Sequence, residues 1–186
     1  MQISVLTLVF GLVTTFSSFG DGHVKVGVTL KPAGSFEAVA DHVQGQGRIF
    51  QTKEGGFKAQ NVILPLQGLT SHMALRDQHM KEKYLQVETH PNATLVSATA
   101  QNGQFTGQMT LHGTTHEVSG TYTLKDGNYV ATFKLKPSDY HIAKASYMGV
   151  GVQDELEIEV SFPKGEIGPA PGTPQGRVPQ NLPKRK

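Results

Sequence analysis

Apolar and polar residues alternate along most of this chain, which is the pattern of half-buried β-strands. The clearest case is the last strand, where Leu156, Ile158 and Val160 face one way and glutamates face the other. The alternation predicts strands at residues 24–30, 35–43, 48–52, 57–66, 93–100, 104–112, 117–125, 128–136 and 154–162. Short turns, such as Asn-Gly at 102–103 and Asp-Gly at 126–127, separate neighbouring strands. We therefore expect an all-β protein whose antiparallel sheet curls into a barrel or a sandwich.

One segment, residues 71–85, has a helical rather than an alternating pattern. Ser71 is a suitable N-cap for this helix, and Pro91 prevents it from extending much further. The segment also carries Arg76, Asp77 and His79 close together. A single helix beside a curled sheet either covers one of its ends or holds a reactive group there.

The N-terminus has the features of a signal peptide. Residues 3–16 are apolar and uncharged, and small residues follow at Ser17, Ser18 and Gly20. The apolar run is shorter than the ~18–20 residues that a membrane-spanning helix needs. We therefore predict a signal peptide over residues 1–20 and a mature protein that is periplasmic or secreted, without a transmembrane span.

Charge and composition divide the remainder into a body and a tail. Residues 21–162 contain 12 Lys and Arg against 14 Asp and Glu, whereas residues 163–186 contain 5 against 1. The second segment is also rich in proline and glycine, which predicts a disordered basic tail. The body shows no basic face with interleaved aromatic residues, so no nucleic-acid partner is expected. The absence of cysteine excludes disulfides and thiolate metal sites.

An ordered set of motifs across the body resembles the YceI family of periplasmic lipid-binding proteins. Residues 75–80 (Leu-Arg-Asp-Gln-His-Met) are similar to its Arg-Asp-x-His-Leu helix, and residues 90–95 (His-Pro-Asn-Ala-Thr-Leu) to its Tyr-Pro-x-x-x-Phe segment. Residues 110–118 are similar to its Gly-containing hairpin, and the last strand to its closing segment. The resemblance implies that residues 21–162 form a lipocalin-like barrel of about eight strands with one helix at the rim. It also implies an apolar interior that holds a polyisoprenoid, quinone-like or fatty-amide lipid.

On this hypothesis the inward apolar side chains of the strands and the helix are the ligand-binding residues. They are Phe36, Val62, Leu64, Leu66, Leu75, Met80, Tyr84, Leu111, Phe133, Leu135, Ile158 and Val160. The same side chains could equally fill the interior as a solid core, which the alternation alone does not distinguish from a tunnel. The candidate head-group contacts are Asp77, His79, Asp139 and His141.

Two other functions are compatible with these residues. One is an enzyme that acts on such a lipid through Asp77 and His79, and the other is an envelope scaffold that uses the basic tail to contact anionic polymers. Residues two apart on a helix do not face each other, so a structural role for Asp77 and Arg76 is favoured over an acid–base pair. The histidines lack the compact spacing of zinc ligands, so neither a metal nor a cofactor is predicted. We therefore predict a non-catalytic lipid carrier. Contact of this carrier with a membrane surface is compatible with the sequence.

Overall fold

The computed structural model describes residues 18–19, 22–41, 45–46, 48–147 and 150–164. Most of the predicted signal peptide and the basic tail from residue 165 lie outside the described residues, and both stay predictions.

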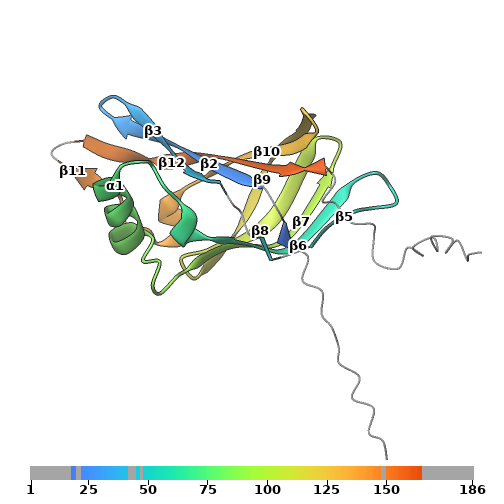
Figure 1. The fold of residues 1–186 in the computed structure, drawn as a ribbon, viewed down its shortest axis with the longest axis horizontal. Helices are drawn as coiled ribbons and strands as arrows, with labels where there is room; N and C mark the ends of the chain where they lie inside the picture. Colours follow the sequence, from blue (N-terminus) through green and yellow to red (C-terminus); the bar gives the residue numbers. More distant parts are fainter. Residues whose placement is uncertain (1–17, 20–21, 42–44, 47, 148–149, 165–186) are drawn as a thin grey trace, which may run out of the picture.

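The main body is one antiparallel sheet that curls into an open barrel (Figure 1). Its strands are β2 (His23–Lys31), β3 (Ser35–Ala40), β5 (Arg48–Gln51), β6 (Phe57–Pro65), β7 (Asn92–Gln101), β8 (Gln104–Leu111), β9 (Thr114–Lys125), β10 (Asn128–Leu135), β11 (Ser146–Tyr147) and β12 (Val150–Pro163). They run in the order β3-β2-β12-β10-β9-β8-β7-β6-β5, with β11 paired to β12. Two further strands, β1 (Ser18–Phe19) and β4 (Gly45–Gln46), pair with each other. The predicted all-β, antiparallel fold is confirmed, and each predicted strand is present.

The two edge strands of this sheet, β3 and β5, are not neighbours in its hydrogen-bonded order. Instead, the segment that follows β6 contacts β3 through an isolated bridge between Val39 and Thr70. The Val39 N–H donates to Thr70 O at 2.7 Å, and the Thr70 N–H donates to Val39 O at 2.8 Å. A connecting segment with the short 3-10 turn η1 (Leu66–Gly68) therefore helps to close the barrel.

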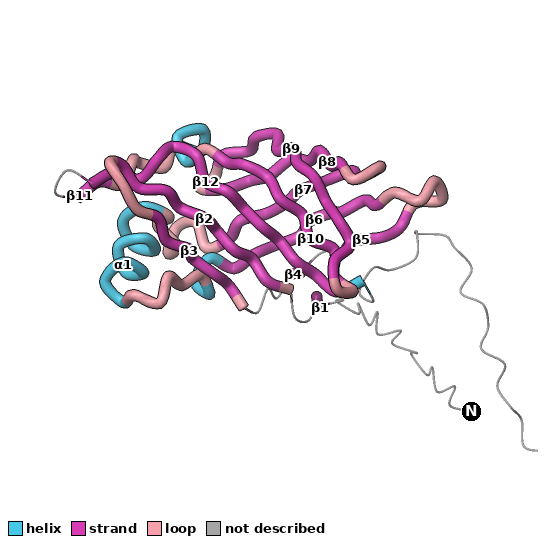
Figure 2. Tube along the Cα trace, turned by 90° about the horizontal axis from the view of Figure 1, so that it is seen from above, coloured by secondary structure: helices cyan, strands magenta, loops and turns pink. Residues whose placement is uncertain are grey.

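The predicted helix is present but begins later than expected. It consists of α1 (Ala74–Gln78), which continues as a π-helical segment η2 (His79–Tyr84). Met73, rather than Ser71, occupies the N-cap position, because the Ser71 side chain instead donates a hydrogen bond to Asp77. Figure 2 shows this helix at one end of the barrel. No helix among the described residues is long and apolar enough to cross a membrane.

The barrel has two different ends, which we call the helix end and the turn end. The helix end carries α1, η2 and a second 3-10 segment, η3 (Pro137–Tyr140). The turn end carries the β5–β6, β7–β8 and β9–β10 turns, and there Asn128 of β10 pairs with Pro163 of β12. Every strand that runs between these ends therefore contributes side chains to both halves of the interior.

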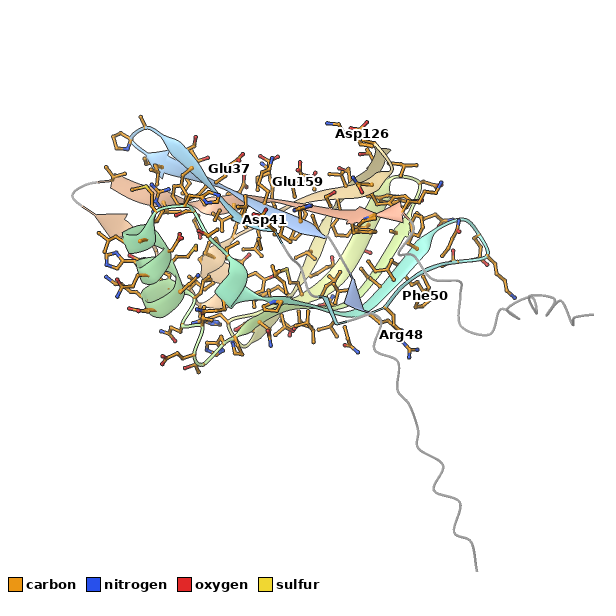
Figure 3. The ribbon with its side chains drawn as sticks, in the orientation of Figure 1. Glu37, Asp41, Arg48, Phe50, Asp126 and Glu159 are labelled. Atoms are coloured by element: carbon orange, nitrogen blue, oxygen red, sulfur yellow. The ribbon has the colours of Figure 1, made fainter. Side chains whose placement is uncertain are left out.

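The outer face of the sheet is polar, as the alternation predicts. Lys134 on β10 forms an ion pair with Glu155 on β12 at 2.7 Å, and Lys25 on β2 pairs with Glu159 at 3.7 Å. In Figure 3, Glu37 and Glu159 point away from the barrel interior. The opposite faces of these strands are thereby left to form the interior.

Candidate ligand-binding cavity

An apolar cavity of about 190 Å³ lies inside the barrel and reaches its turn end. Side chains from β2, β5 to β10 and β12 line it, and almost all of the lining is apolar. For scale, an engineered apolar cavity of about 150 Å³ in another protein stays dry and binds benzene. The cavity is therefore large enough for part of a hydrocarbon ligand and offers very little polar surface to compete for it.

Several small side chains border the cavity together with larger apolar ones. Five alanines border the cavity, namely Ala59, Ala93, Ala98, Ala100 and Ala131. Two glycines on neighbouring strands, Gly107 and Gly120, allow the adjacent strands to approach closely near the cavity. A Cβ at Gly120 would lie 2.2 Å from Thr132 O, and a Cβ at Gly107 would lie 2.6 Å from Ser97 O. A side chain at either glycine would therefore displace the neighbouring strand.

Four aromatic residues, which we call the rim aromatics, border the cavity at the turn end. They are Phe57, Tyr122, Tyr129 and Phe162. Phe57 packs edge-to-face on Tyr129 at 4.8 Å and on Tyr122 at 5.7 Å between ring centroids, and Tyr129 stacks on Phe162 at 5.9 Å. Because the lining contains so little polar surface, the rings rather than the tyrosine hydroxyls face the cavity.

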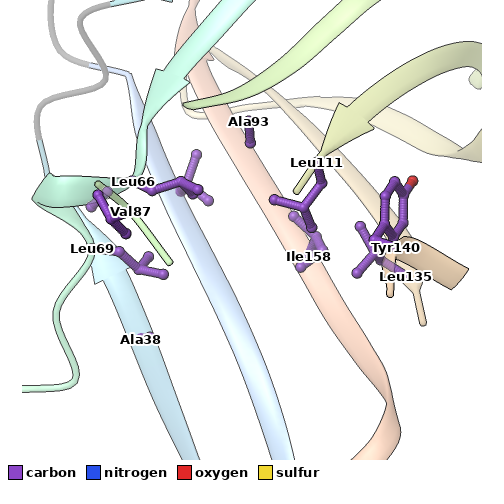
Figure 4. Packing of buried hydrophobic residues seen from close by; sticks show 11 residues of the cluster. Ala38, Leu66, Leu69, Val87, Ala93, Leu111, Leu135, Tyr140 and Ile158 are labelled. Atoms are coloured by element: carbon purple, nitrogen blue, oxygen red, sulfur yellow. The ribbon is translucent and has the colours of Figure 1, made fainter. Parts of the chain in front are cut away.

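The helix end of the same interior is filled by side chains. Its main members, which we call the packed cluster, are Leu66, Leu69, Val87, Leu111, Leu135 and Tyr140 (Figure 4). Ala93 and Ile158 belong both to this hydrophobic core and to the cavity wall. The core therefore forms the floor of the cavity, which does not extend into the helix end.

The predicted ligand-binding residues fall into two groups. Five of them border the cavity: Val62, Leu64, Phe133, Ile158 and Val160. The other seven do not: Phe36, Leu66, Leu75, Met80, Tyr84, Leu111 and Leu135. Leu66, Leu111 and Leu135 are buried in the packed cluster, and Met80 packs against it. The expected inward orientation of Leu75 is wrong, because this side chain is 65% exposed.

Sequence reasoning missed the rim aromatics and the alanines. The signal for the aromatic residues was available, because Tyr129 lies on the same strand face as Phe133, and Phe162 on the same face as Val160. The alanines were missed for a different reason. A search for large apolar side chains finds the residues that fill an interior, whereas a cavity forms where side chains are small.

Asp77 fixes the helix to the barrel. Its carboxylate accepts hydrogen bonds from the Ser71 N–H at 2.7 Å, the Ser71 hydroxyl at 2.6 Å and the Thr70 hydroxyl at 2.5 Å. Burial alone would raise the pKa of Asp77, but these hydrogen bonds outweigh burial and lower the pKa to about 2. The Arg76 guanidinium lies 4.0 Å from the centre of the Phe36 ring on β3. These contacts support the structural role that the sequence favours for both charges.

None of the four candidate head-group contacts borders the cavity. Asp77, His79, Asp139 and His141 all belong to segments at the helix end, opposite the rim aromatics. Thr114 Oγ1 lies 3.1 Å from His141 Nδ1, and no side-chain hydrogen bond between Asp77 and His79 is present among the described residues. No group of three potential metal ligands is found in the described part of the chain. The structure therefore does not assemble these residues into one site.

Comparisons with known proteins agree with this architecture. The model of the YceI-like domain family matches residues 13–163. BcnA from Burkholderia cenocepacia has a similar structure, with a TM-score of 0.57 and 14% identity over 76% of this chain and 94% of that chain. A polyisoprenoid binding domain from Saccharophagus degradans, implicated in plant cell wall breakdown, has a TM-score of 0.53 and 10% identity over 77% and 93%. No curated protein sequence matches significantly. At these identities the two structures establish similarity of fold alone.

Proposed function

Because this chain belongs to the YceI-like domain family, we propose that it is a non-catalytic carrier that holds the apolar part of a lipid in the cavity at the turn end. The observation that carries this proposal is the contrast between an apolar cavity and a packed core within one barrel. A protein that needed its interior only for stability would gain from filling both halves, because empty apolar space costs stability.

The chemistry of the lining defines the class of ligand. Burial of apolar surface contributes roughly 25 cal/mol per Å², so a hydrocarbon that fills the cavity gains affinity in proportion to its buried area. A charged or strongly polar group inside would lose its hydration without a partner. We therefore place the lipid head group outside the cavity, near the rim aromatics.

A polyisoprenoid, a quinone-like lipid or a fatty amide fits this description. The similarity to the Saccharophagus degradans polyisoprenoid binding domain supports the first of these, within the limits of a similarity of fold. The uncharged apolar run at residues 3–16 supports export after removal of residues 1–20, and hence a periplasmic or secreted location.

The enzyme alternative receives less support. An acid–base role for Asp77 requires a carboxylate that is free to exchange protons with a ligand near neutral pH. Its hydrogen bonds to Thr70 and Ser71, its low pKa and its distance in the fold from the cavity lining all support a structural role.

Lipid extraction tests the proposal. The full chain is expressed in a bacterial host and purified without detergent, and its organic extract is analysed by mass spectrometry. We expect a bound apolar lipid in the wild type and much less in Ala98→Phe, which fills the cavity. Thr99→Phe is the matched control, because Thr99 is the next residue on β7 and is exposed. An empty wild-type extract, or equal lipid in Ala98→Phe and the wild type, would contradict the carrier function.

A further inference from the structure

An exposed apolar side chain continues the wall of the cavity at the turn end. Leu124, near the end of β9, is 52% exposed. It pairs across strands with Tyr129 of β10 and lies two residues after Tyr122, so the three side chains share the interior face of the sheet. Both tyrosines border the cavity and are half-buried. The apolar wall therefore extends from the cavity to the solvent through Leu124.

Lysines outnumber acidic residues in the turns at this end. The charged side chains of the β5–β6 and β9–β10 turns, of the two strand residues on either side of each turn, and of the end of β12 are all exposed. They are four lysines, Lys53, Lys58, Lys125 and Lys164, against Glu54 and Asp126. The Lys164 N–H donates to Gly127 O at 3.0 Å, which holds this backbone beside the β9–β10 turn. The apolar wall thus opens among side chains of net positive charge.

The sequence that follows Lys164 adds charge of the same sign. Residues 165–186 lie outside the described part of the chain and contain four Lys and Arg against one Glu. They are joined to the barrel directly after Lys164, at the turn end. Their positive charge is therefore tethered to the end where the cavity opens.

The helix end does not combine these features. It also exposes a leucine, because Leu75 is 65% exposed. However, residues 71–90 carry three Lys and Arg against three Asp and Glu, and none of them borders the cavity. In the described part of the chain, an exposed leucine, an excess of lysines and the cavity coincide at the turn end.

We propose that the turn end is a docking surface for anionic lipid bilayers, with Leu124 at the bilayer interface and the surrounding lysines against the lipid head groups. Negatively charged head groups attract surface lysines, and tyrosine rings favour the boundary between water and hydrocarbon. In this orientation the cavity faces the bilayer, so an apolar chain passes between them with little exposure to water. The surface itself stands on exposure and charge, whereas its role in lipid transfer rests on the proposed carrier function.

Cosedimentation with lipid vesicles tests this docking surface. The protein purified from the bacterial host is mixed with vesicles of phosphatidylglycerol and phosphatidylcholine in equal parts, or of phosphatidylcholine alone. We expect tighter binding to the anionic vesicles, and weaker binding as the salt concentration rises, because salt screens exposed charges. Equal binding to both kinds of vesicle, or binding to neither, overturns the proposal.

Two variants remove one component of the surface each. Leu124→Ser takes about half of a leucine side chain out of the contact and should weaken binding to the anionic vesicles about fivefold. Lys125→Gln removes one lysine near the head groups and should also weaken it about fivefold. Leu75→Ser and Lys83→Gln are the matched controls at the helix end and should bind like the wild type. Losses in these controls as large as those in the turn-end variants overturn the assignment to the turn end.

Two further outcomes separate the docking surface from other functions. If Lys125→Gln weakens binding but Leu124→Ser does not, the surface recognises negative charge alone, which overturns bilayer docking in favour of a soluble anionic polymer. The organic extract of each protein sample is analysed in parallel. A lipid in the extract without vesicle binding overturns the docking surface and leaves the carrier function intact. Vesicle binding with an empty extract overturns the carrier function and leaves the docking surface.

Discussion

The two halves of this barrel interior share several strands and differ in whether the side chains leave an apolar cavity between them. β10 places Ala131 in the hollow half and Leu135 in the packed half, while β8 places Met109 at the cavity and Leu111 in the packed half. The pairing of β10 with β12 is unbroken from Asn128 to Leu135, across the boundary. Alanines occur in both halves and aromatic residues border the cavity, so the contrast lies in how side chains from several strands meet in space rather than in the size of any one of them.

The largest expected effect is on the free energy of unfolding, and it compares a substitution in the packed half with one in the hollow half. Leu135→Ala should destabilise the protein by about 2–5 kcal/mol, because it leaves a void in a packed region. Leu95→Ala, in the half-buried wall of the cavity, should cost roughly half as much, since its side chain already borders empty space. Urea denaturation followed by circular dichroism measures both. Equal losses of unfolding free energy in the two variants would mean that the two halves are packed alike.

The second prediction concerns the close approach of strands beside the cavity. Gly120→Ala should cost about 1–3 kcal/mol, because the new Cβ would lie 2.2 Å from Thr132 O and 2.8 Å from Phe133 Cβ. Gly68→Ala is the matched control, because no atom lies within 4 Å of a Cβ built there. Similar melting temperatures for the two variants would show that the strands can separate freely at Gly120.

The third prediction asks whether a half-buried charge stabilises the helix end of the barrel but not the turn end. Asp77→Asn should cost about 1–2 kcal/mol near neutral pH, because the amide replaces one carboxylate acceptor with a donor. The folded-state pKa of Asp77 is about 2, below its ordinary value of 3.8. Its contribution is therefore fully present above about pH 4 and is lost as the pH falls towards 2.

A pH series of denaturation curves checks this prediction, and the difference between wild type and Asp77→Asn should shrink between pH 4 and 2. Asp126→Asn in the β9–β10 turn is the control at the turn end, with an expected change within about 0.5 kcal/mol. A difference between wild type and Asp77→Asn that does not change with pH would contradict the assigned role of the carboxylate.

The smallest expected effect lies within the packed cluster. The Tyr140 hydroxyl is buried and has no hydrogen-bond partner among the described residues. Tyr140→Phe should therefore leave stability unchanged or raise it by less than about 1 kcal/mol.

Burial, with a smaller contribution from Asp139, raises the pKa of Tyr140 above its ordinary value of 10.0. The wild type should accordingly lose stability faster than Tyr140→Phe above about pH 10, and a clear loss of stability in Tyr140→Phe at neutral pH would contradict this account.

The sequence predicted the sheet well because alternation reports directly which face of a strand is buried. It placed the start of the helix at Ser71, three residues before Ala74, because it did not anticipate that Asp77 would capture the Ser71 side chain. It could not separate Phe133, which borders the cavity, from Leu135, which is packed, because both lie on one face of β10. That distinction depends on the volumes of side chains from several strands that meet in space.

Methyl NMR of the full chain, titrated with a neutral ten-carbon fatty amide, tests the central claim most directly. The account predicts saturable shifts of the methyl signals of Ala98, Ala100 and Ala131, which line the cavity, with much smaller shifts for Leu111 and Leu135. Shifts concentrated at Leu111 and Leu135, or no saturable shift at any of these methyl groups, would contradict binding in the hollow half of the barrel.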